Sequence, residues 1–231
     1  MILKTAVIIA GGKGTRLEEK TEEIPKPLVL LSGKPILERI LEWLKKNGVE
    51  NVVIGVAYKK EKVKDYFGDG SKFGLKIYYT EHDENGGTED AFKIAVERAS
   101  QLAEDFYAMN GDQITDLPLD ELTETHLSTG ALATITTIKL RTRFGIIKID
   151  DKNKILKFNE KENVPNTLMN SGIYIFNKEL LDYLNTGNIE ENAFKKLAKD
   201  GKLFSFYYDG IWFTINDKKQ LKEAEEYLKL K

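Results

Sequence analysis

The chain has 231 residues, of which 41% are hydrophobic and 31% charged, and its formal net charge is −2. This composition supports a sizeable core and argues against disorder, and it lacks the basic excess that is typical of nucleic-acid-binding proteins. The absence of cysteine excludes disulfides, thiol catalysis and cysteine metal sites. Since no apolar run suits a membrane span or a signal peptide, we expect a cytoplasmic protein that binds neither membrane nor nucleic acid.

The first half of the chain alternates apolar runs with helical patterns, which predicts a mostly parallel sheet with helices on both faces. Strands are expected at residues 6–10, 52–57, 75–79 and 106–109, and helices at 35–47, 59–67 and 88–99. Pro35 suits the first position of the helix at 35–47, and Gly48 suits the position directly after its end. Thr88 is the expected N-cap of the third helix.

The segments between predicted strands become shorter after Gly130. This pattern predicts that the second half forms a mixed extension of the same sheet. Strands are expected at residues 131–138, 145–149, 155–158, 172–176 and 203–208, with a hairpin turn at 151–153. Helical patterns follow near Leu180 and Phe194, and a polar helix begins at about Lys218. No Pro/Gly/Ser-rich linker divides the chain, so we expect a single domain, 1–231, with halves at about 1–130 and 131–231.

A glycine-rich loop, Gly11-Gly12-Lys13-Gly14-Thr15-Arg16-Leu17, follows the first strand directly. Consecutive glycines let backbone N–H groups form a concave anion site, and Arg16 and Lys26 add cations that suit phosphate oxygens. The loop is neither a Walker motif, which needs Ser or Thr after the lysine, nor a dinucleotide fingerprint, which needs a glycine near position 17. The pattern favours phosphate binding over a tight turn with two solvated cations.

This loop, together with Pro25-Lys26-Pro27 and Gly33-Lys34-Pro35, resembles the sugar-1-phosphate nucleotidyltransferase family (nucleotide-sugar pyrophosphorylases), in a short form without the C-terminal left-handed β-helix domain. The resemblance implies a Rossmann-like, three-layer α/β/α fold with a mostly parallel central sheet and a mixed sugar-binding extension. It also implies an enzyme that joins a nucleoside triphosphate and a sugar 1-phosphate and releases pyrophosphate. The nucleotide would lie in the half at 1–130 and the sugar phosphate in the half at 131–231.

The same resemblance assigns roles in the first half. Arg16 is implied at the leaving pyrophosphate and Lys26 at the α-phosphate, both as catalytic residues. Asp112 is implied as a catalytic ligand of Mg²⁺, a hard cation that takes oxygen ligands, although a Gly-Asp turn is the ordinary alternative. Glu89 and Asp90 depart from the family's small residues, which leaves the contacts to the base open. The implied nucleotide-binding residues are Ala10, Gly11, Gly12, Lys13, Gly14, Thr15, Glu81, Gly87, Thr88 and Gly111.

Sugar-phosphate binding is implied for the second half. The segment Phe158-Asn159-Glu160-Lys161 resembles the family's Phe-x-Glu-Lys, in which the lysine holds the sugar phosphate, so Lys161 is a fourth catalytic candidate. Without the resemblance these residues would suggest only surface charges and an ordinary strand. The implied sugar-phosphate-binding residues are Gly145, Glu160, Asn170 and Gly172.

Thr214 is the most consequential departure from the family pattern. The family's second metal-binding Asp falls on this position, so one carboxylate is missing, and Asp209 and Asp217 are the candidate substitutes. His82 and His126 have no companion at metal-ligand spacing, and we expect both to be structural or solvated.

Two other functions stay open at this point. A cytidylyltransferase for a small non-sugar phosphate such as phosphocholine would use a similar loop, but the Gly145, Glu160 and Asn170 set favours a sugar. A regulatory subunit that binds nucleotide-sugars without turnover is supported by Thr214 and opposed by the intact Arg16. A homo-oligomer is compatible with the sequence. The pattern leaves base and sugar open, with GTP or a pyrimidine triphosphate and a mannose- or glucose-like sugar favoured.

Overall fold

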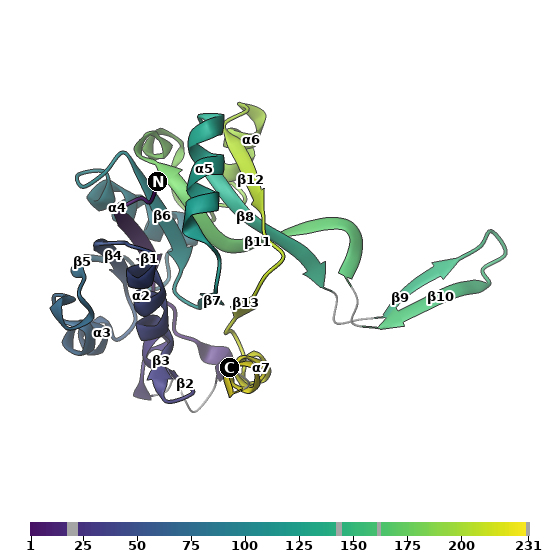
Figure 1. Ribbon diagram of the computed structural model, residues 1–231, viewed down its shortest axis with the longest axis horizontal. Coiled ribbons are helices and arrows are strands. Elements are labelled where there is room, and N and C mark those ends of the chain that lie inside the picture. The colour runs from purple at the N-terminus through teal and green to yellow at the C-terminus, as the bar shows by residue number, and fades with distance from the viewer. Residues whose placement is uncertain (18–22, 142–144, 161–162, 230–231) are drawn as a thin grey trace.

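A seven-stranded sheet in the order β12-β8-β11-β6-β1-β4-β5 forms the centre of the computed structural model, which describes residues 1–17, 23–141, 145–160 and 163–229 (Figure 1). Every strand of this sheet is parallel to its neighbours except β11, which runs antiparallel to β6 and β8. The predicted mostly parallel sheet is therefore confirmed. The strands are β1 (Thr5–Ile9), β4 (Asn51–Val56), β5 (Lys76–Glu81), β6 (Asp105–Asn110), β8 (Ala133–Arg141), β11 (Asn163–Asn177) and β12 (Leu203–Tyr207).

Helices cover both faces of the sheet and give the predicted three layers (Figure 1). Alternate residues of β1 face different cores: Ala6 and Ile8 belong to one, which includes residues of α2, α3, α5 and α7, and Val7 belongs to the other, which includes residues of α4, η4 and α6. The helices are α2 (Ile36–Lys46), α3 (Lys60–Phe67), α4 (Thr88–Ala99), α5 (Leu119–Thr129), α6 (Ala193–Lys199) and α7 (Lys218–Lys229), with 3₁₀ turns η1 (Thr15–Leu17), η2 (Lys26–Leu28), η3 (Ser71–Phe73) and η4 (Lys178–Tyr183).

Helix α2 shows how the sequence pattern becomes structure. Its apolar residues recur at helical spacing and are buried on one stripe, and each contributes about 1.5–3 kcal/mol by leaving water. Gly48 follows the helix with φ +85°, a left-handed conformation that glycine adopts without strain. Pro35 lies one residue before the helix rather than at its first position.

The parallel strands bring distant loops to one edge of the sheet. Ile9 at the end of β1 pairs with Gly55 of β4 and with Asn110 of β6, so the segments after β1 and β6 start side by side. Ligands of open parallel sheets bind at this carboxyl edge. Two small ladders lie beyond the main sheet, β2 (Leu30–Leu31) with β3 (Lys34–Pro35) and β7 (Gln113–Thr115) with β13 (Trp212–Thr214).

One part of the predicted sheet extension is wrong. Residues 145–149 and 155–158 form strands, β9 (Gly145–Ile149) and β10 (Ile155–Glu160), but these pair only with each other. They make a hairpin that projects from the body as an arm (Figure 1). At its tip Asp150 accepts hydrogen bonds from the backbone N–H groups of Lys152 and Lys154, and this tight turn closes the two strands on each other. No helix among the described residues is long and apolar enough to cross a bilayer.

Candidate active site

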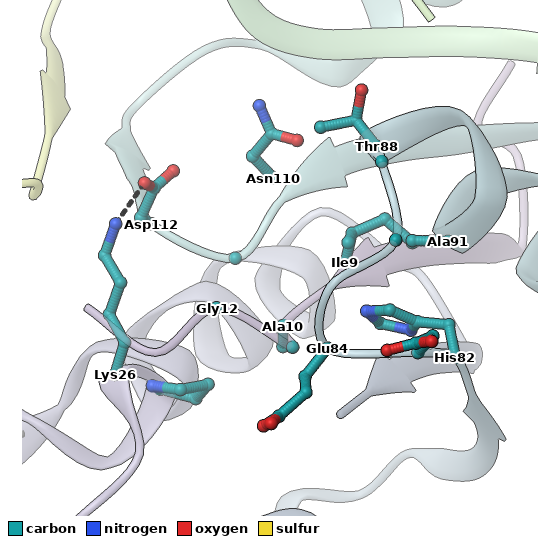
Figure 2. A pocket seen from close by; sticks show the side chains of 16 residues that line it. Ile9, Ala10, Gly12, Lys26, His82, Glu84, Thr88, Ala91, Asn110 and Asp112 are labelled. Atoms are coloured by element: carbon teal, nitrogen blue, oxygen red, sulfur yellow. Dashed lines mark hydrogen bonds and ion pairs between the residues drawn. The ribbon is translucent and has the colours of Figure 1, made fainter. Parts of the chain in front are cut away.

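A pocket of about 300 Å³ opens at the carboxyl edge of the sheet. Its walls come from the end of β1 and the loop after it, from the β5–α4 loop, from the end of β6, and from the segment that carries Lys26 (Figure 2). Eight of the residues singled out from the sequence line it: Ala10, Gly11, Gly12, Lys26, Gly87, Thr88, Gly111 and Asp112. The other lining residues are Ile9, Pro27, His82, Asp83, Glu84, Gly86, Ala91 and Asn110.

Close packing requires glycine at two positions of the pocket floor, Gly11 and Gly111. At Gly111 a Cβ would lie 2.9 Å from the carbonyl oxygen of Ile9, and the N–H of Gly111 donates to that same oxygen at 2.8 Å. At Gly11 a Cβ would lie 2.3 Å from Nε2 of His82. At Gly12 a Cβ would meet no atom of the described residues within 4 Å. The floor is therefore backbone, which is the surface that a phosphate approaches most closely.

Asp112 is the centre of a polar cluster on one wall of the pocket. Its Oδ2 lies 2.5 Å from Nζ of Lys26, and its Oδ1 accepts a hydrogen bond of 2.7 Å from Gln113. Nζ of Lys26 also donates to Oδ1 of Asn216 at 2.9 Å, and Asn216 donates to Oγ1 of Thr214 at 2.8 Å. We call Lys26, Asp112, Gln113, Thr214 and Asn216 the Asp112 cluster. The side chains of Lys26 and Asp112 are only 13% and 15% exposed, so solvent screens this ion pair little.

The Asp112 cluster offers oxygen atoms of the kind that Mg²⁺ takes, but only one carboxylate. Among the described residues, no group of three Asp, Glu, His or Cys side chains could hold a metal ion. A single carboxylate with neutral oxygens beside it fits a Mg²⁺ ion that arrives with the phosphates of a substrate.

The two candidate substitutes for the missing carboxylate have partners outside the Asp112 cluster. Asp209 pairs with Lys139 at 2.6 Å on the surface, and Oδ1 of Asp217 accepts the N–H of Gln220 in the first turn of α7. The residue that completes the Asp112 cluster is Asn216, which the sequence did not single out. In the sequence, Asn216 is marked only as a polar residue two positions after Thr214. Polar residues are too common in any sequence for this to have identified it.

The β5–α4 loop is fixed by Asp90 and Glu89, the two residues that depart from the family pattern. Oδ2 of Asp90 accepts the N–H groups of Gly87 at 2.9 Å and Gly187 at 3.0 Å, and these backbone donors, that of Gly187 first, lower the pKa of Asp90. Buried Glu89 accepts hydrogen bonds from Asn185 and Asn192. The two acidic residues therefore join the start of α4 to the segment at 185–192.

Gly87, rather than Thr88, is the N-cap of α4, so that expectation is wrong. A Cβ at Gly87 would lie 1.6 Å from the carbonyl oxygen of Gly187, and this contact leaves room only for glycine. Thr88 becomes the first helical residue, and its hydroxyl accepts the N–H of Ile189 at 3.3 Å.

Glu81, an expected nucleotide-binding residue, is not among the residues that line the pocket. Its carboxylate pairs with Lys60 and with Lys64 on α3, and hydrogen bonds from these two lysines lower the pKa of Glu81 to about 2. The lining side chains of this loop begin one residue later, with His82. Adjacent residues of an extended segment point to opposite sides, and that alternation separates the two.

The two histidines have different surroundings. His126 is buried, with Nδ1 2.8 Å from the hydroxyl of Thr134 and Nε2 3.3 Å from Asp105, so it is structural as expected. His82 instead lines the pocket (Figure 2). It packs against Gly11, and its buried Nδ1 has no hydrogen-bond partner among the described residues. Burial lowers the pKa of His82 and favours the neutral imidazole. A lone histidine carried no sequence signal for this position.

The cations of the glycine loop lie outside the lining of the pocket. Lys13 pairs with Glu84 at 3.2 Å, which joins the glycine loop to the β5–α4 loop across the pocket. Arg16 and Thr15 are exposed on η1, which is anchored by the fully buried Leu17. Gly14, with φ +68°, precedes this turn in a left-handed conformation.

The predicted sugar-site residues divide into two groups. Gly172 abuts the pocket, because a Cβ there would lie 2.8 Å from the amide nitrogen of Asn110, and Asn170 accepts the N–H of Gly172 at 2.8 Å. Gly145 lies at the root of the arm, where the ring of Phe158 occupies the space that a Cβ would take. Glu160 is the last residue of β10, and Lys161 lies outside the described residues.

The chain is similar to known proteins in sequence and in fold. A family model described as "Nucleotidyl transferase" matches residues 5–224. A UTP–glucose-1-phosphate uridylyltransferase of Synechocystis sp. is 34% identical, over 91% of this chain and 59% of that protein. A probable mannose-1-phosphate guanylyltransferase 1 of Oryza sativa subsp. japonica is 34% identical, over 91% of this chain and 60% of that protein. The crystal structure of HddC from Yersinia pseudotuberculosis matches with a TM-score of 0.76 at 27% identity, over 98% of this chain and all of that one. The chain thus spans about three fifths of the length of the two curated relatives.

Proposed function

The chain belongs to the nucleotidyl transferase family, and we propose that it joins a nucleoside triphosphate to a sugar 1-phosphate, giving a nucleotide-sugar and pyrophosphate. The observation that carries the proposal is the convergence of a glycine floor, a lysine and a carboxylate in one pocket, although Lys26 and Asp112 lie 86 positions apart in the sequence. Both curated relatives described above are named for transfer to a sugar 1-phosphate, which supports the acceptor class.

In the proposed reaction, a phosphate oxygen of the sugar 1-phosphate attacks the α-phosphorus of the triphosphate. A new P–O bond forms there, and the bond to the bridging oxygen of the β-phosphate breaks, so pyrophosphate leaves with that oxygen. The protein has little covalent chemistry to perform, so positioning and neutralisation of phosphate charge supply most of the acceleration. The backbone of Gly11 and Gly12 receives the phosphates, with Lys13, Gly14 and Thr15 continuing the loop.

Lys26 exchanges partners when the substrate binds. In the structure its ammonium group is neutralised by Asp112, at 2.5 Å. An α-phosphate in the pocket replaces Asp112 as the anion that Lys26 contacts, and Arg16 contacts the leaving pyrophosphate from the loop. Asp112 is then free to hold Mg²⁺ with the oxygens of Thr214 and Asn216 beside it, and Mg²⁺, when bound, supplies further neutralisation of the phosphates.

The sugar phosphate binds on the side of Gly172, next to Asn110 in the pocket wall. We assign Lys161 to the phosphate of the sugar, and Glu160, Asn170 and Gly145 to the sugar itself. As substrates we favour GTP or a pyrimidine nucleoside triphosphate together with the 1-phosphate of a mannose- or glucose-like sugar. The names of the two curated relatives, which contain UTP with glucose 1-phosphate and mannose 1-phosphate with guanylyl transfer, are consistent with this choice.

The test is pyrophosphate release over a matrix of nucleoside triphosphates and sugar 1-phosphates with Mg²⁺, with phosphocholine as a non-sugar acceptor. We expect turnover with at least one sugar 1-phosphate. Lys26→Ala should abolish most of it, whereas the control Lys34→Ala should not, because Lys34 lies on the surface and pairs with Glu42. Folded wild-type protein that binds nucleotide-sugars but releases no pyrophosphate with any pair would be a regulatory subunit instead.

Lys161→Ala separates the sugar contacts from the nucleotide contacts. This variant should raise the KM for the sugar phosphate while calorimetric affinity for the triphosphate stays unchanged. Lost triphosphate affinity with an unchanged KM for the sugar phosphate would reverse the assignment.

A further inference from the structure

The sequence contains three Asn-Gly pairs, Asn47-Gly48, Asn85-Gly86 and Asn110-Gly111. In such a pair the backbone nitrogen of the glycine can attack Cγ of the asparagine side chain. Glycine hinders this attack least, because it has no Cβ and wide backbone freedom, and the two reacting atoms are already held close together by the chain. The fold decides which of the three pairs can reach the geometry of this reaction.

The hydrogen bonds of the glycine nitrogens do not separate the three pairs. In each pair the glycine N–H donates to a backbone carbonyl oxygen at 2.8–3.0 Å, and the acceptors are Lys45, Asp83 and Ile9. Each nitrogen must therefore leave one hydrogen bond of similar length before it attacks. The difference between the pairs lies in how the fold holds the asparagine.

Asn47 and Asn110 are both restrained. Nδ2 of Asn47 donates to the carbonyl oxygen of Trp43 at 2.9 Å, at the end of α2. The backbone of Asn110 pairs with Ile9 of β1 in the central sheet, and the residue is half-buried. Attack on Asn47 must first break its side-chain hydrogen bond, and attack on Asn110 requires the end of β6 to leave the sheet.

Asn85 has neither restraint. It is exposed in the β5–α4 loop, and its side-chain amide makes no hydrogen bond with any described residue. Its backbone N–H donates to Oδ1 of Asp83 at 2.8 Å, which leaves the side chain free to turn toward the nitrogen of Gly86. Exposed loops with few buried contacts also open at the lowest free energy.

We propose that Asn85 is a site of spontaneous deamidation, which proceeds in the folded protein while Asn47 and Asn110 stay intact. The nitrogen of Gly86 forms a bond to Cγ of Asn85, and the Cγ–Nδ2 bond breaks. The proton of Gly86 passes through water to the departing nitrogen, so ammonia leaves and a succinimide ring remains. Water then opens the ring at either carbonyl and gives aspartate or isoaspartate. In isoaspartate the main chain runs through the former side chain and is longer by a methylene group.

The modification changes one wall of the pocket. Both sequence neighbours of Asn85, Glu84 and Gly86, line the pocket, and so does Asp83. Either product adds a carboxylate beside those of Asp83 and Glu84, and isoaspartate also displaces Gly86. Both changes disfavour a triphosphate in the pocket, the first because like charges repel. This consequence rests on the proposed function, whereas the modification itself does not.

Peptide mass spectrometry of wild-type protein, incubated at mildly alkaline pH, follows all three pairs in one digest. The same protein unfolded in denaturant gives the rate that each local sequence allows, and the folded rate is divided by it. We expect this ratio to be at least about fivefold higher for Asn85 than for Asn47, the factor that one net hydrogen bond contributes, and higher still relative to Asn110. An equal or higher ratio at Asn47 or Asn110 overturns the proposal. So does an intact Asn85 in folded protein after all three pairs have converted in denaturant.

Calorimetry with GTP and UTP as probes tests the effect on the pocket. Wild-type protein should lose triphosphate affinity during the incubation, whereas Asn85→Gln, whose longer side chain closes its ring more slowly, should keep it. Asn85→Asp adds the charge without the longer backbone, and it should weaken triphosphate binding by about twofold to fivefold, the range of an exposed charge contact. Conversion at Asn85 with unchanged affinity overturns the effect on the pocket. Fresh wild-type protein that binds no triphosphate contradicts the proposed function and leaves the mass-spectrometric result standing.

Discussion

Gly11→Ala introduces a methyl group where the pocket floor and His82 are in contact. The new Cβ would lie 2.3 Å from Nε2 and 2.6 Å from Cε1 of His82, and 2.9 Å from Cβ of Ala57. Gly55 is a second neighbour of this imidazole, because a Cβ there would lie 3.5 Å from its Nδ1. Overpacking of this kind costs about 1–3 kcal/mol of the free energy of unfolding.

For a chain of this size, a loss of that magnitude lowers the melting temperature by about 2–10 °C. Differential scanning calorimetry of ligand-free protein measures it. Gly12→Ala is the matched control, because its Cβ would meet no atom within 4 Å in the described part of the chain, and we expect a change within about 0.5 kcal/mol. Adding His82→Ala to Gly11→Ala should recover most of the loss, with a coupling energy of about 1–3 kcal/mol.

Two results would refute this reasoning. If Gly11→Ala melts within a degree or so of Gly12→Ala, His82 moves aside at little cost, and Gly11 is not held by packing. If the losses from Gly11→Ala and His82→Ala simply add, the strain lies elsewhere in the loop.

Three further predictions concern the chemistry of the pocket. Lys26→Ala should lower kcat/KM in pyrophosphate release by on the order of 10²-fold or more, and near-normal turnover would remove Lys26 from the catalytic set. Thr214→Asp should lower the Mg²⁺ concentration needed for half-maximal rate, since it adds a second carboxylate to the Asp112 cluster; tight Mg²⁺ binding by wild-type protein without nucleotide would contradict this. Because burial lowers the pKa of His82, the unfolded chain binds more protons below about pH 6.5. Wild-type stability, measured by urea unfolding, should therefore fall more between pH 7 and pH 5 than that of His82→Gln, and equal slopes would count against it.

Periodicity alone determined the layered fold of this chain. The apolar runs that became β1, β4 and β6 and the helical stripe of α2 are local patterns, and burial of each requires the next layer. The glycine loop could be recognised from the sequence, because close packing of the backbone requires glycine and the requirement is met by residue type alone. Lys26 and Asp112 were found as separate residues, and their contact follows from the common edge of a parallel sheet.

Only the tertiary structure decided which side chain of a segment contacts which other part of the chain. Glu81 and His82 are adjacent, yet one pairs with α3 and the other lines the pocket, because the loop after β5 sets the direction of each side chain. Asn216 joined the Asp112 cluster because β13 pairs with β7, a contact across about a hundred residues. Tertiary structure also decided that β9 and β10 pair with each other rather than with the main sheet. These strands have ordinary alternation, and a local pattern does not specify which long-range partner supplies the hydrogen bonds, since that depends on the competing geometry of the whole chain.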